Sequence, residues 1–132
     1  ASQWLKESKD HAECCHQLKT DPLNNAIKLL GVKALITGVR WDEQKARADE
    51  EYYSPRDNPE HVRIQPILHF RELDIWQFIK EFSVPYCKLY NEGYRSLGCI
   101  PCTSLSSGVN ERSGRTSHKE EIMSKLRELG YF

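Results

Sequence analysis

The sequence lacks any long apolar run, and no stretch approaches the roughly 18 apolar residues that a membrane-spanning helix needs. It also lacks an excess of charge of either sign, because 19 Lys and Arg balance 19 Asp and Glu. A neutral balance disfavours a broad surface for nucleic acid or membrane, but it allows a small local anion pocket. The polar start, ASQWLKESKD, has no apolar segment typical of a secretory signal. We therefore expect a cytoplasmic protein without a membrane or nucleic-acid partner.

The cysteines are few and unsuited to a disulfide framework. There are five, an odd number, and two of them are adjacent in the chain. Thiols kept in a reducing compartment and used as metal or cluster ligands fit this pattern better. The length of 132 residues is enough for one domain with a core of its own.

The first half of the chain has the pattern of an α/β unit. Asp21 suits a helix N-cap and Pro22 the first helical position, and Gly31 is placed to end the helix. Residues 34–39 (ALITGV) are typical of a short buried strand. A helix, a tight turn and a buried strand together predict an α/β fold with a parallel sheet.

Further elements follow at regular intervals. Residues 41–51 are strongly charged and predict a loop or solvated helix, and 54–59 (SPRDNP) a turn-rich connector. Residues 62–68 predict a second strand, with Pro66 at an edge or near its end. Apolar residues from Leu73 to Phe82 predict a helix with a buried face. A last helix is expected to open on a capping box of Ser117 and Glu120 and to stop at Gly130.

Two cysteine pairs, Cys14-Cys15 and Cys99-x-x-Cys102, carry the strongest chemical signal. Four thiolates from two short segments can close a zinc site or hold a 4Fe–4S cluster. Adjacent cysteines suit a large cubane slightly better than a single ion, and burial as small apolar side chains is the third interpretation. The fifth, Cys87, fits neither pair and is interpreted as an inert core thiol.

Four segments in order then resemble the adenylyl-sulfate and phosphoadenylyl-sulfate reductase family. They are HAECC (11–15) with Lys19 and Pro22-Leu23, ITGVR (36–40), PILHF (66–70) and GYRSLGCIPCT (93–103). The resemblance implies the C-terminal portion of a parallel-sheet, adenine nucleotide alpha-hydrolase-like fold. Residues 1–116 would form a partial nucleotide- and cluster-binding domain, and residues 117–132 its C-terminal helix.

The resemblance also implies ligands. The two cysteine pairs resemble those of the branch that holds a 4Fe–4S cluster and reduces adenylyl sulfate, with zinc as the less favoured alternative. Three basic residues resemble the family's substrate-binding cations: Lys19, Arg112 and Arg115. Gly38 and Arg40 resemble its turn at the nucleotide, and Arg47 is a looser match. Arginine suits this task because its planar guanidinium bonds sulfate or phosphate through two N–H groups at once.

Two departures from the family pattern stand out. Complete members begin with a Ser-Gly-Gly-x-Asp-Ser type phosphate loop, and nothing here resembles it, so we expect it to precede Ala1 or to lie on another chain. Family reductases also attack the substrate with a cysteine in a C-terminal Glu-Cys-Gly-x-His motif, whereas no cysteine follows Cys102 here. The chain's close, a helix ending in Gly130-Tyr-Phe, is typical of a natural C-terminus.

The sequence leaves three functions open. The first is a sulfonucleotide reductase-like protein of sulfate assimilation, releasing sulfite and AMP once a nucleophilic cysteine and a thioredoxin-like electron donor are supplied. The second is a nucleotidyl transferase using ATP and resembling the small subunit of sulfate adenylyltransferase, because Arg40-Trp-Asp42-Glu43 with Arg47 is similar to its RxDExxxR stretch. The third is a cluster-bearing nucleotide-binding module without reductase activity. Association with the missing half, or with a second copy, is expected for each.

Overall fold

A computed structural model describes residues 11–132 and opens with a long helical segment. Helix α2 (His11–Cys15) runs through a π-helical stretch (His16–Thr20) into α3 (Asp21–Leu30). The predicted N-cap at Asp21 is wrong, because Thr20 before it already has helical dihedral angles and the helix continues. Gly31 ends α3 at φ 62°, as predicted, a left-handed conformation that glycine adopts without steric cost.

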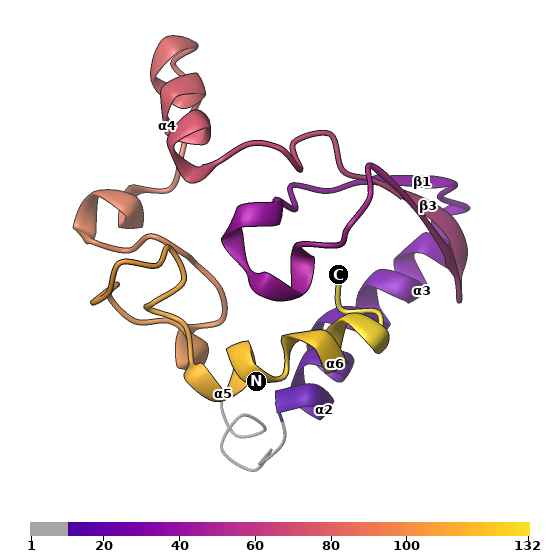
Figure 1. Ribbon diagram of the computed structural model, residues 1–132. Coiled ribbons are helices and arrows are strands. Elements are labelled where there is room, and N and C mark those ends of the chain that lie inside the picture. Colours follow the sequence, from indigo (N-terminus) through magenta and orange to yellow (C-terminus); the bar gives the residue numbers. More distant parts are fainter. Residues whose placement is uncertain (1–10) are drawn as a thin grey trace.

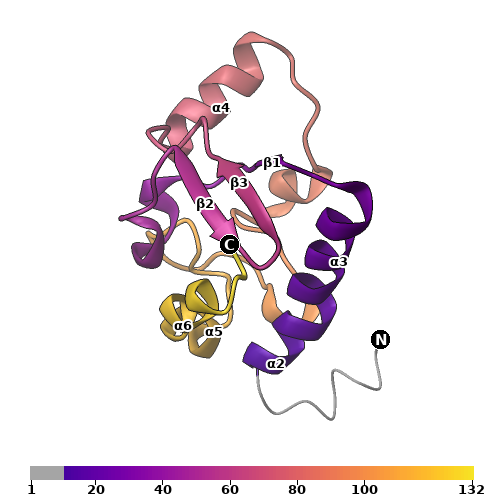
Figure 2. The same cartoon turned by 90° about the vertical axis from the view of Figure 1, so that its right-hand side faces the viewer.

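A three-stranded sheet follows, with the order β1-β3-β2. Strand β1 (Ala34–Ile36) pairs parallel with β3 (Glu60–Ile64), which pairs antiparallel with β2 (Tyr53–Asp57). Figure 2 shows the β2–β3 hairpin beside β1 and α3. The parallel pair confirms the α/β prediction, and Pro66 lies two residues beyond β3, where it disturbs no ladder bond.

Two local predictions for this region are wrong. Residues 54–59 are mostly strand rather than connector, since the turn is confined to 58–59. Strand β1 is three residues long and little buried, with Ile36 72% exposed, because among the described residues it pairs on one side only. An apolar run predicts a strand but not the number of neighbours that cover it.

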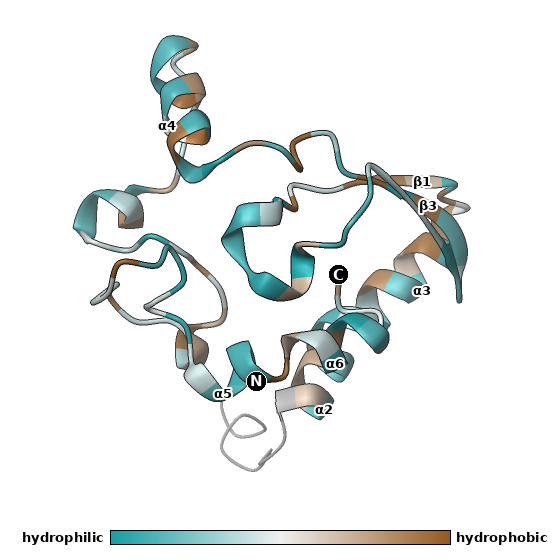
Figure 3. Cartoon of the chain, in the orientation of Figure 1, coloured by the Kyte–Doolittle hydropathy of each residue, from teal (hydrophilic) through white to brown (hydrophobic). Residues whose placement is uncertain are grey.

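Helix α4 (Glu72–Glu81) projects from the body of the molecule (Figure 1). Its predicted burial is wrong: none of its side chains is buried, and Leu73 and Phe78 are 68% and 47% exposed. Figure 3 shows the apolar residues along it. Trp76 does make edge contacts with Tyr86 and Tyr90 at centroid distances of 5.3 and 5.2 Å, so the helix packs locally on the segment that follows it.

The C-terminal helices close the fold. Helix α5 (Ser117–Glu121) is followed after Ile122 by α6 (Met123–Glu128), and Gly130 ends the segment at φ 85°. The predicted capping box is wrong, because Thr116 is the N-cap and makes no side-chain cap bond. Short 3-10 turns complete the structure: Trp41–Glu43, Lys45–Arg47, Lys88–Glu92 and Ile100–Cys102. None of the helices within 11–132 is long and apolar enough to cross a membrane.

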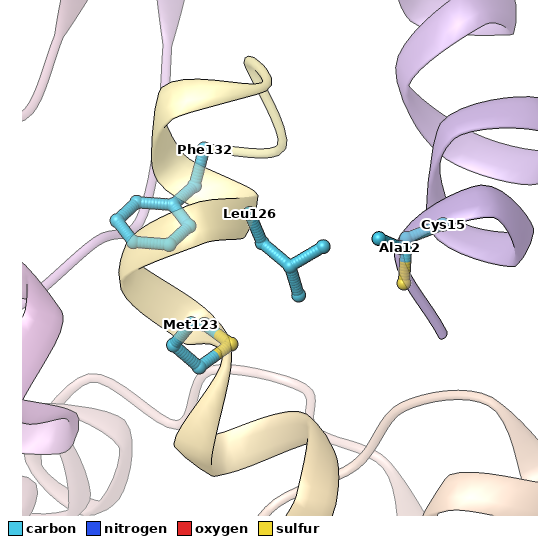
Figure 4. Close-up of a cluster of buried hydrophobic side chains, with 5 residues drawn as sticks. All are labelled: Ala12, Cys15, Met123, Leu126 and Phe132. Atoms are coloured by element: carbon cyan, nitrogen blue, oxygen red, sulfur yellow. The ribbon is translucent and has the colours of Figure 1, made fainter. Parts of the chain in front are cut away.

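The apolar core joins the two ends of the described chain. Ala12 and Cys15 on α2 face Met123 and Leu126 on α6, with Phe132 beside them (Figure 4). Met123 and Leu126 are each 1% exposed. Burial of such side chains stabilises a fold by roughly 1.5–3 kcal/mol each. This contact holds the first cysteine pair against the C-terminal helices.

Candidate functional site

The two cysteine pairs lie at the ends of different local structures. Cys14 and Cys15 close α2, whereas Cys99 directly precedes and Cys102 ends a single 3-10 turn. Cys15 and Cys102 are buried, Cys14 and Cys99 are partly exposed, and none forms a disulfide. Burial and then the charges of Cys15, Cys99 and Cys102 raise the pKa of Cys14. The early thiols are therefore within electrostatic reach of the later two.

The thiols are not gathered as tightly as ligands of one ion. Within residues 11–132, no three Cys, His, Asp or Glu side chains are grouped so that they could hold a single metal ion. A tetrahedral zinc site draws its sulfurs to about 2.3 Å from one point. A cubane cluster binds each thiolate at a separate iron corner, so its ligands stand farther apart.

Lys19 lies beside the second cysteine pair. Its ammonium donates to the Tyr131 hydroxyl at 3.1 Å and lies over the Tyr131 ring. Burial opposes its charge, but hydrogen bonds to Tyr131 and to the Cys99 sulfur raise the pKa of Lys19. Lys119, which is 1% exposed, donates to the same hydroxyl at 3.2 Å. Two fixed cations therefore stand next to the thiols.

Arg115 is held by the loop that carries Cys99. Its Nη1 donates to the Leu97 carbonyl at 2.7 Å and to the Ser96 hydroxyl at 3.3 Å. The residue is 9% exposed, and its Nε has no hydrogen-bond partner. Gly98 permits this approach, because a Cβ there would lie 2.3 Å from Arg115 Nη2. The loop and the arginine are thus fitted to one another.

Arg112 is oriented by an acid of α5. Its Nε and Nη2 donate to the two oxygens of Glu120 at 2.8 and 2.7 Å. Although burial opposes the negative charge, this bidentate contact lowers the pKa of Glu120. A planar guanidinium held at one edge keeps its other N–H groups available for an anion.

Arg40 and Arg47 belong to an ion-pair network around the first 3-10 turn. Arg40, 5% exposed, contacts Asp42 at 2.7 Å and both oxygens of Glu111 at 2.6 and 2.5 Å. Arg47 pairs with Glu43 and lies over the Phe132 ring, 4.7 Å from its centroid. Burial opposes the Arg40 charge, yet the carboxylates, Glu111 first, raise its pKa.

One polar cavity of about 270 Å³ collects most of the predicted substrate residues. Lys19, Arg47, Arg112 and Arg115 line it, together with the Gly98 loop. Arg40 lines an adjoining cavity of about 100 Å³ instead, and Gly38 is in the lining of neither. The structure therefore brings four of the six predicted residues into one cavity and sets a fifth at its neighbour.

Sequence reasoning missed several residues of this cavity. They are Tyr90, Arg95, Glu111 and Tyr131. Arg95 lies inside the GYRSLGCIPCT segment, so its position was a usable signal. Glu111 and Tyr131 offered no such signal, since only tertiary contacts with Arg40 and Lys19 place them there.

Two further predictions concern the remaining thiol and an imidazole. Cys87 was expected in the core, but it is exposed, at the start of a 3-10 turn. An unpaired thiol is commonly buried, yet nothing in the local sequence fixes that outcome. His11, whose place in the HAECC segment suits either a cluster-orienting or a surface side chain, begins α2, but its side chain lies outside the described part of the structure.

Solved structures define the class of fold. The chain superimposes on Candida glabrata FMN adenylyltransferase in complex with FMN and an ATP analogue with a TM-score of 0.58 and 22% identity, covering 94% of this chain and 50% of that one. Yeast FAD synthetase gives a TM-score of 0.59 at 28% identity over 65% of this chain and 31% of that one. The protein thus has the adenine nucleotide alpha-hydrolase-like α/β fold of these nucleotidyltransferases.

Sequence relatives define the family. The phosphoadenosine phosphosulfate reductase domain matches residues 2–105, and the chain belongs to that family. Adenosine 5'-phosphosulfate reductase of Oceanobacillus iheyensis is 34% identical over 104 residues, covering 78% of this chain and 42% of the relative. The reductase of a Geobacillus species is 36% identical, covering 78% and 43%. The chain therefore spans somewhat less than half the length of these relatives.

Proposed function

We propose that this chain supplies the sulfonucleotide-binding and cluster-binding part of an adenylyl-sulfate reductase. The cavity that joins Lys19, Arg47, Arg112 and Arg115 beside the cysteine pairs is the observation that supports it most directly. An adenylyl sulfate carries a phosphate and a sulfate, and both are bound well by fixed guanidinium and ammonium groups. The named relatives are reductases of this substrate class.

The residues of this chain would bind and orient the substrate. Arg112, held edge-on by Glu120, and Arg115, held by the Leu97 carbonyl, would present N–H groups to the anionic oxygens. Lys19 would place a positive charge between the cavity and the Cys99 sulfur. Fixing cations before the substrate arrives lowers the cost of reorganisation when charge shifts in the reaction.

The reaction itself needs a thiolate nucleophile. Such a thiolate attacks the sulfate sulfur, the S–O bond to AMP breaks, and a thiosulfonate remains on the attacking sulfur. A dithiol donor of the thioredoxin kind then reduces that bond and sulfite leaves. Since Cys87 is exposed at a turn and lines neither cavity, we propose that the nucleophile lies outside residues 1–132.

We further propose that Cys14, Cys15, Cys99 and Cys102 hold a 4Fe–4S cluster. The donor set fits, because Cys14 lies within electrostatic reach of the other three thiols and two lysines lie nearby to balance the charge of thiolates. When bound, the cluster would tie the two segments together and set the electrostatic field beside Lys19. Hydrogen bonds to the sulfurs and nearby charges set the reduction potential of such clusters.

Metal analysis after anaerobic preparation tests the cluster. We expect about four irons and as many sulfides per chain, as for a four-cysteine cubane. Cys102→Ser should lower the iron content sharply, whereas Cys87→Ser should leave it unchanged. Stoichiometric zinc in place of iron would contradict the cluster proposal.

Titration calorimetry with adenylyl sulfate tests the cavity. Arg112→Gln should weaken binding about tenfold or more, because a charge-assisted contact is lost. The matched control is Arg71→Gln, which removes an arginine whose side chain is 69% exposed and pairs with Asp74 outside the cavity. Equal affinities of the two variants for adenylyl sulfate would argue against sulfonucleotide binding in the cavity that Arg112 lines.

A nucleotidyl transferase remains the second candidate, because the Arg40–Asp42 and Arg47–Glu43 pairs build a compact network from the RxDExxxR-like stretch. The full-length protein would then release pyrophosphate from ATP in the presence of sulfate. Release of sulfite from adenylyl sulfate, with a dithiol donor present, favours the reductase instead. Measuring both products in parallel separates the two functions.

A further inference from the structure

A second basic cavity, of about 290 Å³, lies between the β2–β3 hairpin and the end of α6. It shares no lining residue with the cavity beside the cysteines. Figure 2 shows the hairpin next to the C-terminal segment. Arg56 and Arg63 from the hairpin and Arg127 from α6 line it, together with His61.

Two of the basic side chains of this cavity are buried, and a single buried carboxylate lies beside its three arginines. Arg63 and His61 are 3% and 4% exposed. Within residues 11–132, the one buried acid beside the three arginines is Glu50, which bonds Arg127 and lies 3.7 Å from Arg56 Nη2. Buried charges are normally paired, so three guanidinium groups around one carboxylate leave an excess of positive charge.

Three polar atoms of the same residues have no hydrogen-bond partner among the described residues. They are Arg56 Nη2, Arg63 Nε and His61 Nε2, each fully buried. Because His61 Nδ1 donates to the Pro59 carbonyl at 2.7 Å, Nε2 is a donor only when the imidazole is doubly protonated. Two other groups of these side chains are engaged: Arg56 Nη1 donates to the Phe132 main-chain oxygen at 2.8 Å and Arg63 Nη2 to that of Gly130 at 3.2 Å. Buried donors without hydrogen-bond partners are rare, so the two arginine nitrogens call for an explanation.

The electrostatics agree with this geometry. Burial, followed by the charges of Arg63 and Arg127, lowers the pKa of Arg56 to about 10, against the opposing effect of Glu50. Asp57 and Glu128 also line the cavity, but both are exposed at its rim, where water screens them. The buried part of the cavity therefore carries the arginine charges, whereas the carboxylates of Asp57 and Glu128 lie at its exposed edge.

We propose that this cavity binds a small tetrahedral oxyanion, a sulfate or phosphate group, at a site separate from the sulfonucleotide cavity. Several N–H groups converge from two elements, and a doubly charged anion would both pair the guanidinium groups and accept their free bonds. The anion would also link the hairpin to the end of α6 and thereby stabilise the fold.

Nuclear magnetic resonance of the labelled imidazoles tests the proposal at the site itself. Sodium sulfate, sodium phosphate and AMP are titrated separately against sodium chloride of equal ionic strength. We expect a saturable shift of the His61 resonance with sulfate or phosphate and none with chloride. A response to AMP alone would overturn the inorganic oxyanion as ligand. Retention of the sulfate shift in Arg112→Gln would show that the site is independent of the proposed function.

An isosteric variant supplies the control. Asn24 lines the cavity from α3, whereas Asn25 does not. Asn24→Asp adds a negative charge without changing volume and should weaken anion binding about tenfold, while Asn25→Asp should not. Arg56→Gln should weaken binding to at least the same extent. An unshifted His61, or equal affinities of Asn24→Asp and Asn25→Asp, would overturn the proposal.

Discussion

Gly98 and Arg115 are fitted so closely that the guanidinium occupies the space of a side chain at position 98. An added Cβ would lie 2.3, 2.6 and 2.8 Å from Nη2, Cζ and Nη1 of Arg115. Gly98 precedes Cys99, and Arg115 also bonds the main chain of Leu97. The relationship therefore connects a cysteine of the proposed cluster directly to a cation of the proposed substrate cavity.

Gly98→Ala should displace Arg115 and destabilise the fold by roughly 1–3 kcal/mol, the usual cost of overpacking. Urea unfolding measures the change in unfolding free energy. Titration calorimetry measures the accompanying loss of affinity for adenylyl sulfate. Truncating the arginine removes the collision, so Gly98→Ala should cost much less in an Arg115→Ala background. If the changes in unfolding free energy caused by the two substitutions were additive, the steric explanation would be incorrect.

Glu50 is expected to make stability depend on pH in acid. Its side chain is 4% exposed, and although burial raises its pKa, the hydrogen bonds from Arg127 and Gln65 lower it overall from 4.5. A carboxylate with a lowered folded pKa stabilises the protein above its unfolded pKa and loses that contribution as the pH falls through the folded value.

Glu50→Gln should therefore destabilise the protein by about 3–5 kcal/mol at neutral pH, because it leaves buried guanidinium groups without their counter-charge. The difference from the unmodified protein should shrink below pH 4.5. Urea unfolding at a series of pH values measures the loss of stability at neutral pH and its decrease in acid. A difference that is independent of pH would contradict the assigned role of the charge.

Thiol reactivity should follow exposure. Cys87 is exposed, whereas Cys15 and Cys102 are buried. An alkylating reagent should label Cys87 fastest and the two buried thiols slowest in the folded protein, since access limits the reaction. Mass spectrometry of timed digests gives the rates, and labelling in denaturant is the control, because all five should then react. Faster labelling of Cys102 than of Cys87 would refute the order.

Two leucines of the C-terminal segment offer a matched pair. Leu126 is 1% exposed and packs in the core of Figure 4, whereas Leu129 is 49% exposed. Leu126→Ala should cost about 2–5 kcal/mol of unfolding free energy, the range for a buried cavity. Leu129→Ala should cost no more than about 1 kcal/mol. Similar costs, measured by urea unfolding, would show that the contact between α2 and α6 is not the core.

The sequence by itself determined what local chemistry can specify. The left-handed stop at Gly31, the parallel pairing implied by a helix followed by a strand, and the family motif around Cys99 all depend on residues near one another in the chain. Such features follow from backbone preference and residue type, so one sequence suffices. Lys19, Arg112 and Arg115 were predicted from their resemblance to the family's substrate-binding cations.

Only the tertiary structure decided which apolar faces are covered and which charges meet. The stripe on α4 predicted a helix correctly, but Leu73 is exposed because, within the described residues, no element packs over it. Likewise, the contacts of Glu111 with Arg40 and of Tyr131 with Lys19 join residues 71 and 112 positions apart. Burial and ion pairing depend on what the fold brings alongside a residue, and no local pattern encodes that.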